Sequence, residues 1–330
     1  MLRKVRNATL VLGAAFVVCY SATIERLDPT WLWINPVDIE SRDLVYGAGS
    51  PARAPKTTEF TFVEEDTGGV NPKYVVKDAN GVEWKVKIGL EARPEIAASR
   101  LVWAAGYHTY EDYFVPALRV SNMPEKVRGQ SLIGPGGTMT DARLRRIFKN
   151  EKKVGFWNWD ESPYLGTREF NGLRTMMALL NNWDIKDTNT AIVDNWKSTP
   201  ARPVRMYMAS DLGSSFGSTE MLWKQSDTKG NLELYTLSPF ITSSTADQVS
   251  FSVPGDFRLN GTFVTYLFRR PRKWITRDIP RQDAKWLGEL LSRLSPAQIR
   301  DAFKGAGYPT VEADLFARVV ERRIAALKSL

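Results

Sequence analysis

Residues 181–189 read Asn-Asn-Trp-Asp-Ile-Lys-Asp-Thr-Asn, and they follow a segment, 170–180, whose apolar side chains recur at helical spacing. The pattern D-x-K-x-x-N places a carboxylate (Asp184), an ammonium (Lys186) and a carboxamide (Asn189) on one tight loop after the predicted helix. Phosphoryl transfer uses this combination, because a carboxylate orients the attacking hydroxyl, a cation stabilises the transferring oxygens and a neutral oxygen binds Mg²⁺. The pattern alone is only a hypothesis, since roughly one chain of this length in twenty carries it by chance.

A second candidate loop follows a predicted strand. Residues 204–213 read Val-Arg-Met-Tyr-Met-Ala-Ser-Asp-Leu-Gly, in which valine and two methionines alternate as in a strand and Asp211 stands at its end. A carboxylate there, on a loop freed by Gly213, suits a divalent metal bound to polyphosphate oxygens. A surface Asp-x-Gly turn gives the same pattern, so the residues by themselves leave both interpretations open.

The segment upstream predicts a small antiparallel sheet with one helix. Three antiparallel strands joined by tight turns are predicted from Phe60, over 73–77 and over 82–88, and a further strand is predicted over 113–120. A helix of about three turns is predicted from Pro94, because proline is favoured at the first helical position.

Groups on this sheet and helix suit nucleotide phosphates. Lys87, on the third strand, can reach the α and β phosphates, and Glu95, on the following helix, can hold Lys87 through an ion pair. Gly68 and Gly69 lie in the turn between the first two strands, where backbone N–H groups can cover phosphates.

Three of these assignments have alternatives. Lys85 shares a strand face with Lys87 and is the other candidate for the phosphate lysine. Glu91 is the alternative to Glu95; we prefer Lys87 because it lies closest to the helix, and Glu95 because it stands in the first helical turn. Asp187 is either a metal or substrate ligand or, as we prefer, a polar loop residue.

These features form an ordered set that resembles the protein-kinase-like superfamily, in which a strand lysine, a catalytic loop and D-F-G occur in that order. Asp184 to Asn189 is similar to the kinase catalytic loop, and residues 211–213 are similar to D-F-G, with leucine in place of phenylalanine. The turn 68–73 is similar to the Gly-x-x-Pro-Lys loop of HipA-type kinases. An export signal, described below, suggests kinship with atypical secreted kinases such as CotH spore-coat kinases and secretory-pathway casein kinases. The resemblance covers residues 60–215 by motif.

The chain also departs from the kinase pattern. Asn182 and Trp183 stand where kinases have His-Arg, and no Ala-Pro-Glu follows Asp211 at a useful distance. Asp211 follows Asn189 by 22 positions, because residues 194–203 insert a loop. The resemblance therefore does not extend to an activation segment controlled by phosphorylation.

The resemblance implies a two-lobed kinase-like α+β fold. The implied N-lobe, a small antiparallel sheet with one helix, spans residues 58–120, and the larger, mostly helical C-lobe spans 121–330. ATP with Mg²⁺ or Mn²⁺ is implied in the cleft between them. The activity implied is transfer of the γ-phosphoryl group to a hydroxyl acceptor, which is a protein, a sugar or a lipid.

The resemblance also implies a role for each candidate residue. Asp184 would orient the acceptor and accept its proton, and Lys186 would offset charge on the transferring group. The remaining roles are metal binding by Asn189 and Asp211, phosphate binding by Lys87, positioning of that lysine by Glu95, and covering of the phosphates by Gly68 and Gly69.

The N-terminus predicts export. Residues 1–22 combine a basic start, an apolar stretch too short to span a bilayer comfortably, and a small-x-small pattern at Cys19 to Ser21. We expect a cleaved signal peptide and a periplasmic or extracellular protein; an uncleaved anchor or lipidation at Cys19 would instead attach it to a membrane. Residues 23–57 show no sustained period and are predicted to form an irregular N-terminal segment.

Composition excludes several classes of site. One cysteine and one histidine among 330 residues exclude an internal disulfide framework, a thiolate zinc cluster and a multi-histidine metal site. The net charge of +8 is spread along the chain, so nucleic-acid binding is not indicated. His108 is predicted to be exposed and without a chemical role, and the basic stretch 143–153 is predicted to be a solvated helix face. Amphipathic helices are predicted over 283–294, after Ser295, and over 311–327.

Two other functions use the same residues. A catalytically inactive protein that keeps the fold for binding or scaffolding is the main rival, because ATP is scarce outside the cytoplasm. Retention of every charged position in the motif set argues against it. Nucleotidyl transfer is the third interpretation, and the sequence does not separate it from phosphoryl transfer.

Overall fold

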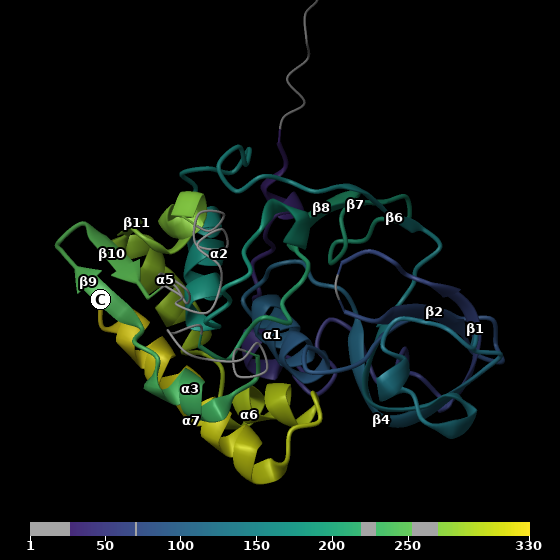
Figure 1. Ribbon diagram of the computed structural model, residues 1–330. Helices are drawn as coiled ribbons and strands as arrows, with labels where there is room; N and C mark the ends of the chain where they lie inside the picture. The colour runs from purple at the N-terminus through teal and green to yellow at the C-terminus, as the bar shows by residue number, and fades with distance from the viewer. Residues whose placement is uncertain (1–26, 70, 219–228, 253–269) are drawn as a thin grey trace, which may run out of the picture.

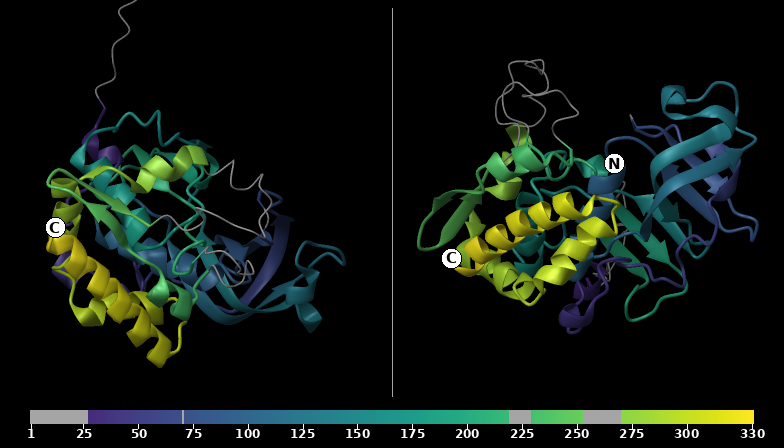
Figure 2. Two further views of the ribbon diagram at one scale, coloured as in Figure 1. Left: turned by 60° about the vertical axis from the view of Figure 1, so that its left-hand side comes forward. Right: turned by 90° about the horizontal axis from the view of Figure 1, so that it is seen from below.

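The computed structural model describes residues 27–69, 71–218, 229–252 and 270–330 (Figure 1). The predicted signal peptide, residues 1–22, lies outside the described residues. The described chain forms two lobes, a β-barrel and a larger, mostly helical lobe, which lie beside each other in all three views (Figures 1 and 2). The predicted class, a two-lobed α+β fold, is confirmed.

The smaller lobe is a closed five-stranded barrel with the order β1-β2-β3-β5-β4. Its strands are β1 (Glu59–Glu65), β2 (Lys73–Lys77), β3 (Glu83–Lys87), β4 (Asp112–Ser121) and β5 (Thr138–Arg146). All neighbours are antiparallel except β1 and β4, whose parallel pairing closes the barrel. The three predicted strands from Phe60 to residue 88 are therefore present, and so is the strand predicted over 113–120.

Apolar and basic side chains alternate along the strands and lie on opposite faces of the barrel wall. Apolar residues of β2, β3 and β5 fill the barrel, namely Tyr74, Val76, Trp84, Val86 and Leu144. Successive side chains of a strand point to opposite faces. The outer face therefore carries the basic residues between them, which are Lys73, Lys85, Lys87, Arg143 and Arg145.

This strand arrangement corrects two predictions. The N-lobe does not end at residue 120, because β5 lies between β3 and β4 in the barrel. The basic stretch 143–153 is not a solvated helix face, since it comprises the end of β5, a turn and strand β6 (Glu151–Gly155). Arg143 lies on the outer face of the barrel and Leu144 in its core, which is the alternation of a strand. The many basic residues in this stretch made that alternation hard to recognise in the sequence.

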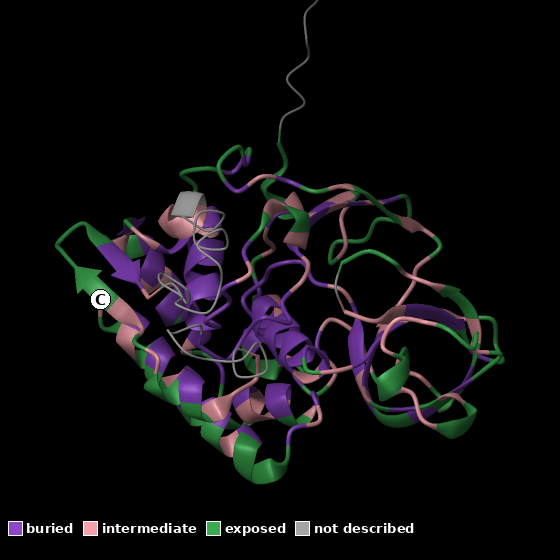
Figure 3. Ribbon diagram, viewed as in Figure 1, coloured by how far each residue is buried: buried purple, intermediate pink, exposed green. Residues whose placement is uncertain are grey.

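Two helices form the centre of the molecule. Helix α1 (Ala92–Ala104) follows β3, and helix α2 (Arg168–Leu179) precedes the D-x-K-x-x-N loop. Almost every side chain of both is buried, as their colour in Figure 3 shows, because α1 packs between the barrel and helix α6 and α2 packs against helix α5. Thr167 caps α2 by accepting a hydrogen bond from the backbone N–H of Phe170.

Within the described residues, the larger lobe adds two small sheets and the helices α3, α5, α6 and α7. One sheet has the order β6-β7-β8 and the other β11-β10-β9. The bounds are β7 (Thr190–Asn195), β8 (Arg205–Ala209), β9 (Ile241–Ser244), β10 (Gln248–Phe251), β11 (Ile279–Pro280), α3 (Leu232–Leu237), α5 (Arg281–Leu291), α6 (Pro296–Lys304) and α7 (Thr310–Lys328). Short 3₁₀ helices span Pro29–Trp31, Ile39–Ser41, Gln130–Leu132, Pro135–Gly137, Asp187–Asn189 and Arg270–Thr276. The predicted cap at Ser295 is present as a capping box with Gln298.

The irregular segment before β1 packs against the larger lobe. Its Ile39 and Leu44 are fully buried, and Trp33 Nε1 donates a hydrogen bond to the carbonyl of Ala105 at 2.7 Å. His108 was predicted to be exposed, which is wrong: it is 6% exposed, and its Nε2 donates to the carbonyl of Thr30 at 2.7 Å. The covering segment lies 78 positions away in sequence, so no local pattern around His108 signals its burial. Within the described residues, no helix has the length and apolar character to cross a membrane.

Candidate active site

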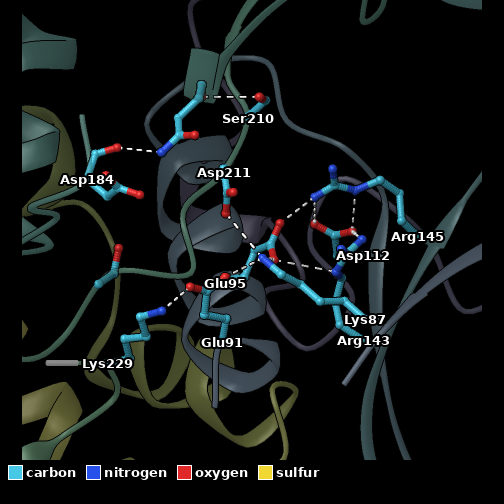
Figure 4. A network of polar contacts seen from close by, with 12 residues as sticks. Lys87, Glu91, Glu95, Asp112, Arg143, Arg145, Asp184, Ser210, Asp211 and Lys229 are labelled. Atoms are coloured by element: carbon cyan, nitrogen blue, oxygen red, sulfur yellow. Dashed lines mark hydrogen bonds and ion pairs between the residues drawn. The ribbon is translucent and has the colours of Figure 1, made fainter. Parts of the chain in front are cut away.

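Lys87 is the centre of a buried ionic network on the outer face of the barrel (Figure 4). Its side chain is 2% exposed, and its Nζ contacts three carboxylates. The distances are 2.8 Å to Glu95 Oε2, 2.6 Å to Glu91 Oε2 and 3.2 Å to Asp211 Oδ1. The strand lysine, the helix glutamate and the D-x-G aspartate predicted from separate motifs therefore meet at one ammonium group.

Burial and neighbouring charges have opposite effects on the pKa values of Lys87 and Glu95. Burial alone lowers the pKa of Lys87, but the carboxylates of Glu95, Asp211 and Glu91 outweigh it and raise the pKa above its ordinary value. Burial likewise raises the pKa of Glu95, and Arg143, Lys87 and Arg145 outweigh it and hold that pKa well below its usual range. Both groups are therefore charged at neutral pH.

Two arginines of β5 hold Glu95 in place. Arg145 Nη2 contacts Glu95 Oε1 at 2.7 Å, and Arg143 Nε lies 3.6 Å from Glu95 Oε2. Both arginines also pair with the buried Asp112, and the Arg145 guanidinium lies 4.0 Å from the ring centroid of Tyr110. This support was not predicted from the sequence, although the strand alternation of β5 places both arginines on the face of Lys87.

The structure separates the alternatives left open by the sequence. Lys85 pairs with Asp66 at 2.7 Å, whereas Lys87 contacts both candidate glutamates. Glu91, the N-cap residue of α1, also pairs with Lys229. The two glutamates therefore share Lys87 rather than excluding each other.

Glycine permits the close approach of the Asp211 loop to α1. A Cβ atom on Gly213 would lie 2.7 Å from the Cβ of Glu91, which is closer than real Cβ atoms come. Any larger residue at this position would displace the loop that carries Asp211. The third residue of D-x-G thus has a packing reason in this chain.

The Gly-rich turn lies near the basic face of the barrel. Asp66 Oδ1 accepts a hydrogen bond from the backbone N–H of Gly68 at 2.9 Å, and Asp66 Oδ2 pairs with Lys85, so the turn is tied to β3. Gly69 has a φ of +72°, and a Cβ on it would lie 3.7 Å from Lys73 Nζ. Lys73 lies directly opposite Lys87 in the strand register. Burial, together with the charges of Lys87 and Lys85, lowers the pKa of Lys73 against the pull of Asp66 and Asp211.

The D-x-K-x-x-N loop carries a paired carboxylate and ammonium. Asp184 Oδ1 lies 2.9 Å from Lys186 Nζ. Asn182 Oδ1 accepts a hydrogen bond from the backbone N–H of Asp184 at 3.0 Å, and its Nδ2 donates to Ser215 Oγ at 3.2 Å. Asn182, which stands where kinases have histidine, therefore supports the backbone of the loop, and Trp183, at the arginine position, is buried beside it.

Asn189 links this loop to the Asp211 loop. Its Nδ2 donates to the carbonyl of Asp184 at 2.6 Å, and its own carbonyl accepts the backbone N–H groups of Ser210 and Asp211 at 2.9 and 3.2 Å. A small cavity has Asp184, Lys186, Asn189 and Asp211 in its wall. The contacts thus run from Asp184 through Asn189 and Asp211 to Lys87.

The donors at this point fit a hard divalent cation. Asn189 uses its Nδ2 as a donor to the Asp184 carbonyl, which leaves Oδ1 as the side-chain oxygen that a cation could use, and the Asp211 side chain is 42% exposed. Mg²⁺ is commonly held by one or two such oxygens together with phosphates and water. Among the residues that the structure describes, no group of three or more His, Cys, Asp and Glu side chains is arranged to hold a metal.

The Asp187 carboxylate is held by neighbouring protein groups. Its Oδ1 accepts the backbone N–H of Trp159 at 3.2 Å, and its Oδ2 lies 3.5 Å from Arg272. These contacts fit the preferred interpretation of Asp187 as a polar loop residue.

Comparisons with known proteins give fold neighbours only. No protein-family model matches the chain, and no curated protein sequence matches it. Among solved structures, the Helicobacter pylori proinflammatory kinase CtkA is similar at 12% identity and a TM-score of 0.47, over 83% of this chain and 97% of that chain. A Golgi casein kinase is similar at 10% identity and a TM-score of 0.38, over 82% and 71% of the two chains. A structure of the Golgi casein kinase with Mn/ADP bound is similar at 10% identity and a TM-score of 0.37, over 92% and 80%.

Proposed function

We propose that this protein transfers the γ-phosphoryl group of ATP to a hydroxyl acceptor with the help of a divalent cation. The observation that carries the proposal is the contact of Lys87 Nζ with Glu95 at 2.8 Å and with Asp211 at 3.2 Å. It joins a strand lysine, a helix glutamate and a metal-type aspartate, which are the parts that kinase-like sites combine.

Lys87 binds the α and β phosphates, and Glu95 positions it. A buried ammonium in contact with three carboxylates is charged and aligned, and it exchanges one of these contacts for a phosphate oxygen when nucleotide binds. Lys73 and the backbone of Gly68 and Gly69 add donors above the phosphates. Like charges directly opposite each other in a sheet are destabilising, and phosphates between Lys73 and Lys87 offset that repulsion.

Asp184 orients the acceptor hydroxyl and accepts its proton as the new O–P bond forms. The bond between the γ-phosphorus and the bridging oxygen breaks, and ADP leaves with that oxygen. Lys186, paired with Asp184 in the structure, offsets the charge on the transferring group.

Asn189 and Asp211 would hold Mg²⁺ or Mn²⁺ through their side-chain oxygens. When bound, the cation neutralises polyphosphate charge and so favours departure of ADP. The predicted export segment, residues 1–22, places the acceptor in the periplasm or outside the cell, where it is a protein, a sugar or a lipid.

Label transfer tests the proposal. The protein is incubated with Mg²⁺ or Mn²⁺ and with ATP labelled at either the α or the γ position, and label is followed into an acceptor mixture or into the chain itself. Transfer of γ label alone is expected. Transfer of α label would assign nucleotidyl transfer instead, and nucleotide binding without any transfer would favour the scaffold function.

A further inference from the structure

A second cavity lies beside the candidate active site. Its volume is about 640 Å³, within the range of small-molecule pockets. Its wall is built by the start of α1, the residues before β2, the β4–β5 hairpin, residues 229–230 and the connection from α6 to α7. None of Lys87, Asp184, Asn189 and Asp211 lines it, so it is distinct from the proposed transfer site.

Two hydrogen-bond donors in the wall of this cavity have no acceptor. Tyr308 Oη and Arg93 Nε are both buried, and neither finds a hydrogen-bond partner in the described part of the chain. Tyr308 is 7% exposed, and burial raises the pKa of its phenol, which therefore keeps its proton at neutral pH. A buried donor without an acceptor is destabilising, which points to a partner that the protein itself does not supply.

These donors lie close to each other, and a lysine lines the same cavity. The Arg93 guanidinium carbon is 6.0 Å from the ring centroid of Tyr308. Gly230 has a φ of +60°, and a Cβ on it would lie 2.5 Å from Tyr308 Oη, so the phenol reaches this wall only because residue 230 is glycine. The neighbouring Lys229 lines the same cavity. A guanidinium, a phenol and an ammonium therefore surround one volume.

The carboxylates nearby leave these donors unsatisfied. Asp141 is engaged by Arg93 Nη2 at 2.8 Å, which does not involve Nε. Glu91 is shared between Lys87 and Lys229, and Glu312 is exposed. The remaining wall is mixed: Asn71, Thr140, Asp141 and Glu312 line it together with the apolar residues Pro72, Ile88, Leu90, Pro94 and Leu132. Leu90 and Leu132 are 61% and 48% exposed, although both line a cavity.

We propose that this cavity binds a small molecule that carries an oxyanion, a phosphate or a carboxylate, on an apolar body. The oxyanion accepts hydrogen bonds from Tyr308 Oη and Arg93 Nε beside the charge of Lys229. The apolar body lies against Leu90 and Leu132. Because Lys229 and Lys87 share Glu91, an oxyanion here competes for Lys229 next to the phosphate lysine. The binding itself is independent of whether the protein transfers phosphoryl groups.

Phenyl phosphate and benzoate serve as probes, which distinguish a phosphate from a carboxylate. Each is titrated into the full chain, and binding is followed by calorimetry and by the melting temperature. We expect saturable binding of at least one probe, tighter than that of inorganic phosphate or acetate, which lack the apolar body. Tyr308→Phe removes one oxygen and should weaken binding about tenfold or more, because a hydrogen bond to a charged group is lost. Tyr207→Phe, a change of the same atom elsewhere, should leave probe affinity unchanged.

Stability without ligand gives a second readout. Since Tyr308 Oη has no partner, Tyr308→Phe should melt no lower than the wild type when no probe is present. Lower stability of this variant would show that the phenol is already satisfied and would overturn the proposal. Absence of saturable binding at millimolar concentrations of both probes, unchanged affinity in Tyr308→Phe, or an equal loss of affinity in Tyr207→Phe would each overturn it as well.

Discussion

Protonation of His108 should lower the stability of the folded chain. Burial lowers the pKa of His108 to about 4, against the opposing effect of its hydrogen bond to Thr30, with a smaller lowering by the charge of Arg202. In the unfolded chain the imidazole titrates near its ordinary value of about 6.5. The unfolded state therefore binds more protons than the folded state between these two values, so the free energy of unfolding falls as the pH falls through that window.

The size of the stability loss follows from the pKa shift of His108. Moving the pKa from about 6.5 to about 4 is worth about 3 kcal/mol in full, of which about 2 kcal/mol is lost between pH 7 and pH 5. His108→Gln keeps an amide donor for the Thr30 carbonyl but does not titrate, so this part of the pH dependence should disappear in the variant.

Two assays check this prediction. His108 is the one histidine of the chain, so a single imidazole resonance reports its titration in the folded protein. Urea unfolding at pH 7 and pH 5, for wild type and His108→Gln, gives the difference in stability loss directly. An imidazole that titrates near 6.5 in the folded state, or equal losses in both proteins, would refute the reasoning.

Three further predictions concern the site and its scaffold. Arg145→Met leaves the buried carboxylates of Glu95 and Asp112 without this partner and should lower the free energy of unfolding by about 3–5 kcal/mol. Arg146→Met, at the next residue of the barrel, should lower it by less than about 1 kcal/mol, and denaturant unfolding compares the two variants. ATP with Mg²⁺ should raise the melting temperature of the wild type, and Asp211→Ala should remove the metal-dependent part of that shift while remaining folded; an unchanged shift would exclude Asp211 as a metal ligand. Ser295→Ala removes the capping box of α6 and should cost about 1 kcal/mol in the same unfolding assay; no measurable cost would show that the cap is dispensable.

Local patterns predicted much of the fold. The strands around Lys87, the helix that carries Glu95 and the cap at Ser295 follow from periodicity and capping residues, which act over a few positions. The pairing of Lys87 with Glu95 was also accessible, since the two lie 8 positions apart on consecutive elements.

Long-range contacts were not accessible from these patterns. The ion pair that holds Glu95 comes from Arg145, 50 positions away, and it requires that β5 lies between β3 and β4 in the barrel. Burial of His108 depends on a segment near the N-terminus of the described chain, and Tyr308 reaches the second cavity because α6, which precedes it, packs against α1. Periodicity assigns elements but does not say which of them become neighbours.

The central claim is that Asp184 acts in the transfer step while Asp211 also binds the nucleotide. An orienting carboxylate contributes mainly to the transition state, whereas metal ligands contribute to ground-state binding as well. Asp184→Asn is nearly isosteric. Asp314→Asn, a partly exposed position on α7 that pairs with Arg300, serves as the matched control.

The most direct measurement is the rate of γ-label transfer from ATP beside the affinity for ATP·Mg²⁺, in the wild type and these variants. The account predicts that Asp184→Asn abolishes transfer and keeps the affinity within a few-fold of wild type, that Asp211→Ala loses both, and that Asp314→Asn changes neither. Transfer by Asp184→Asn at the wild-type rate would contradict the account, because Asp184 would then not accept the proton.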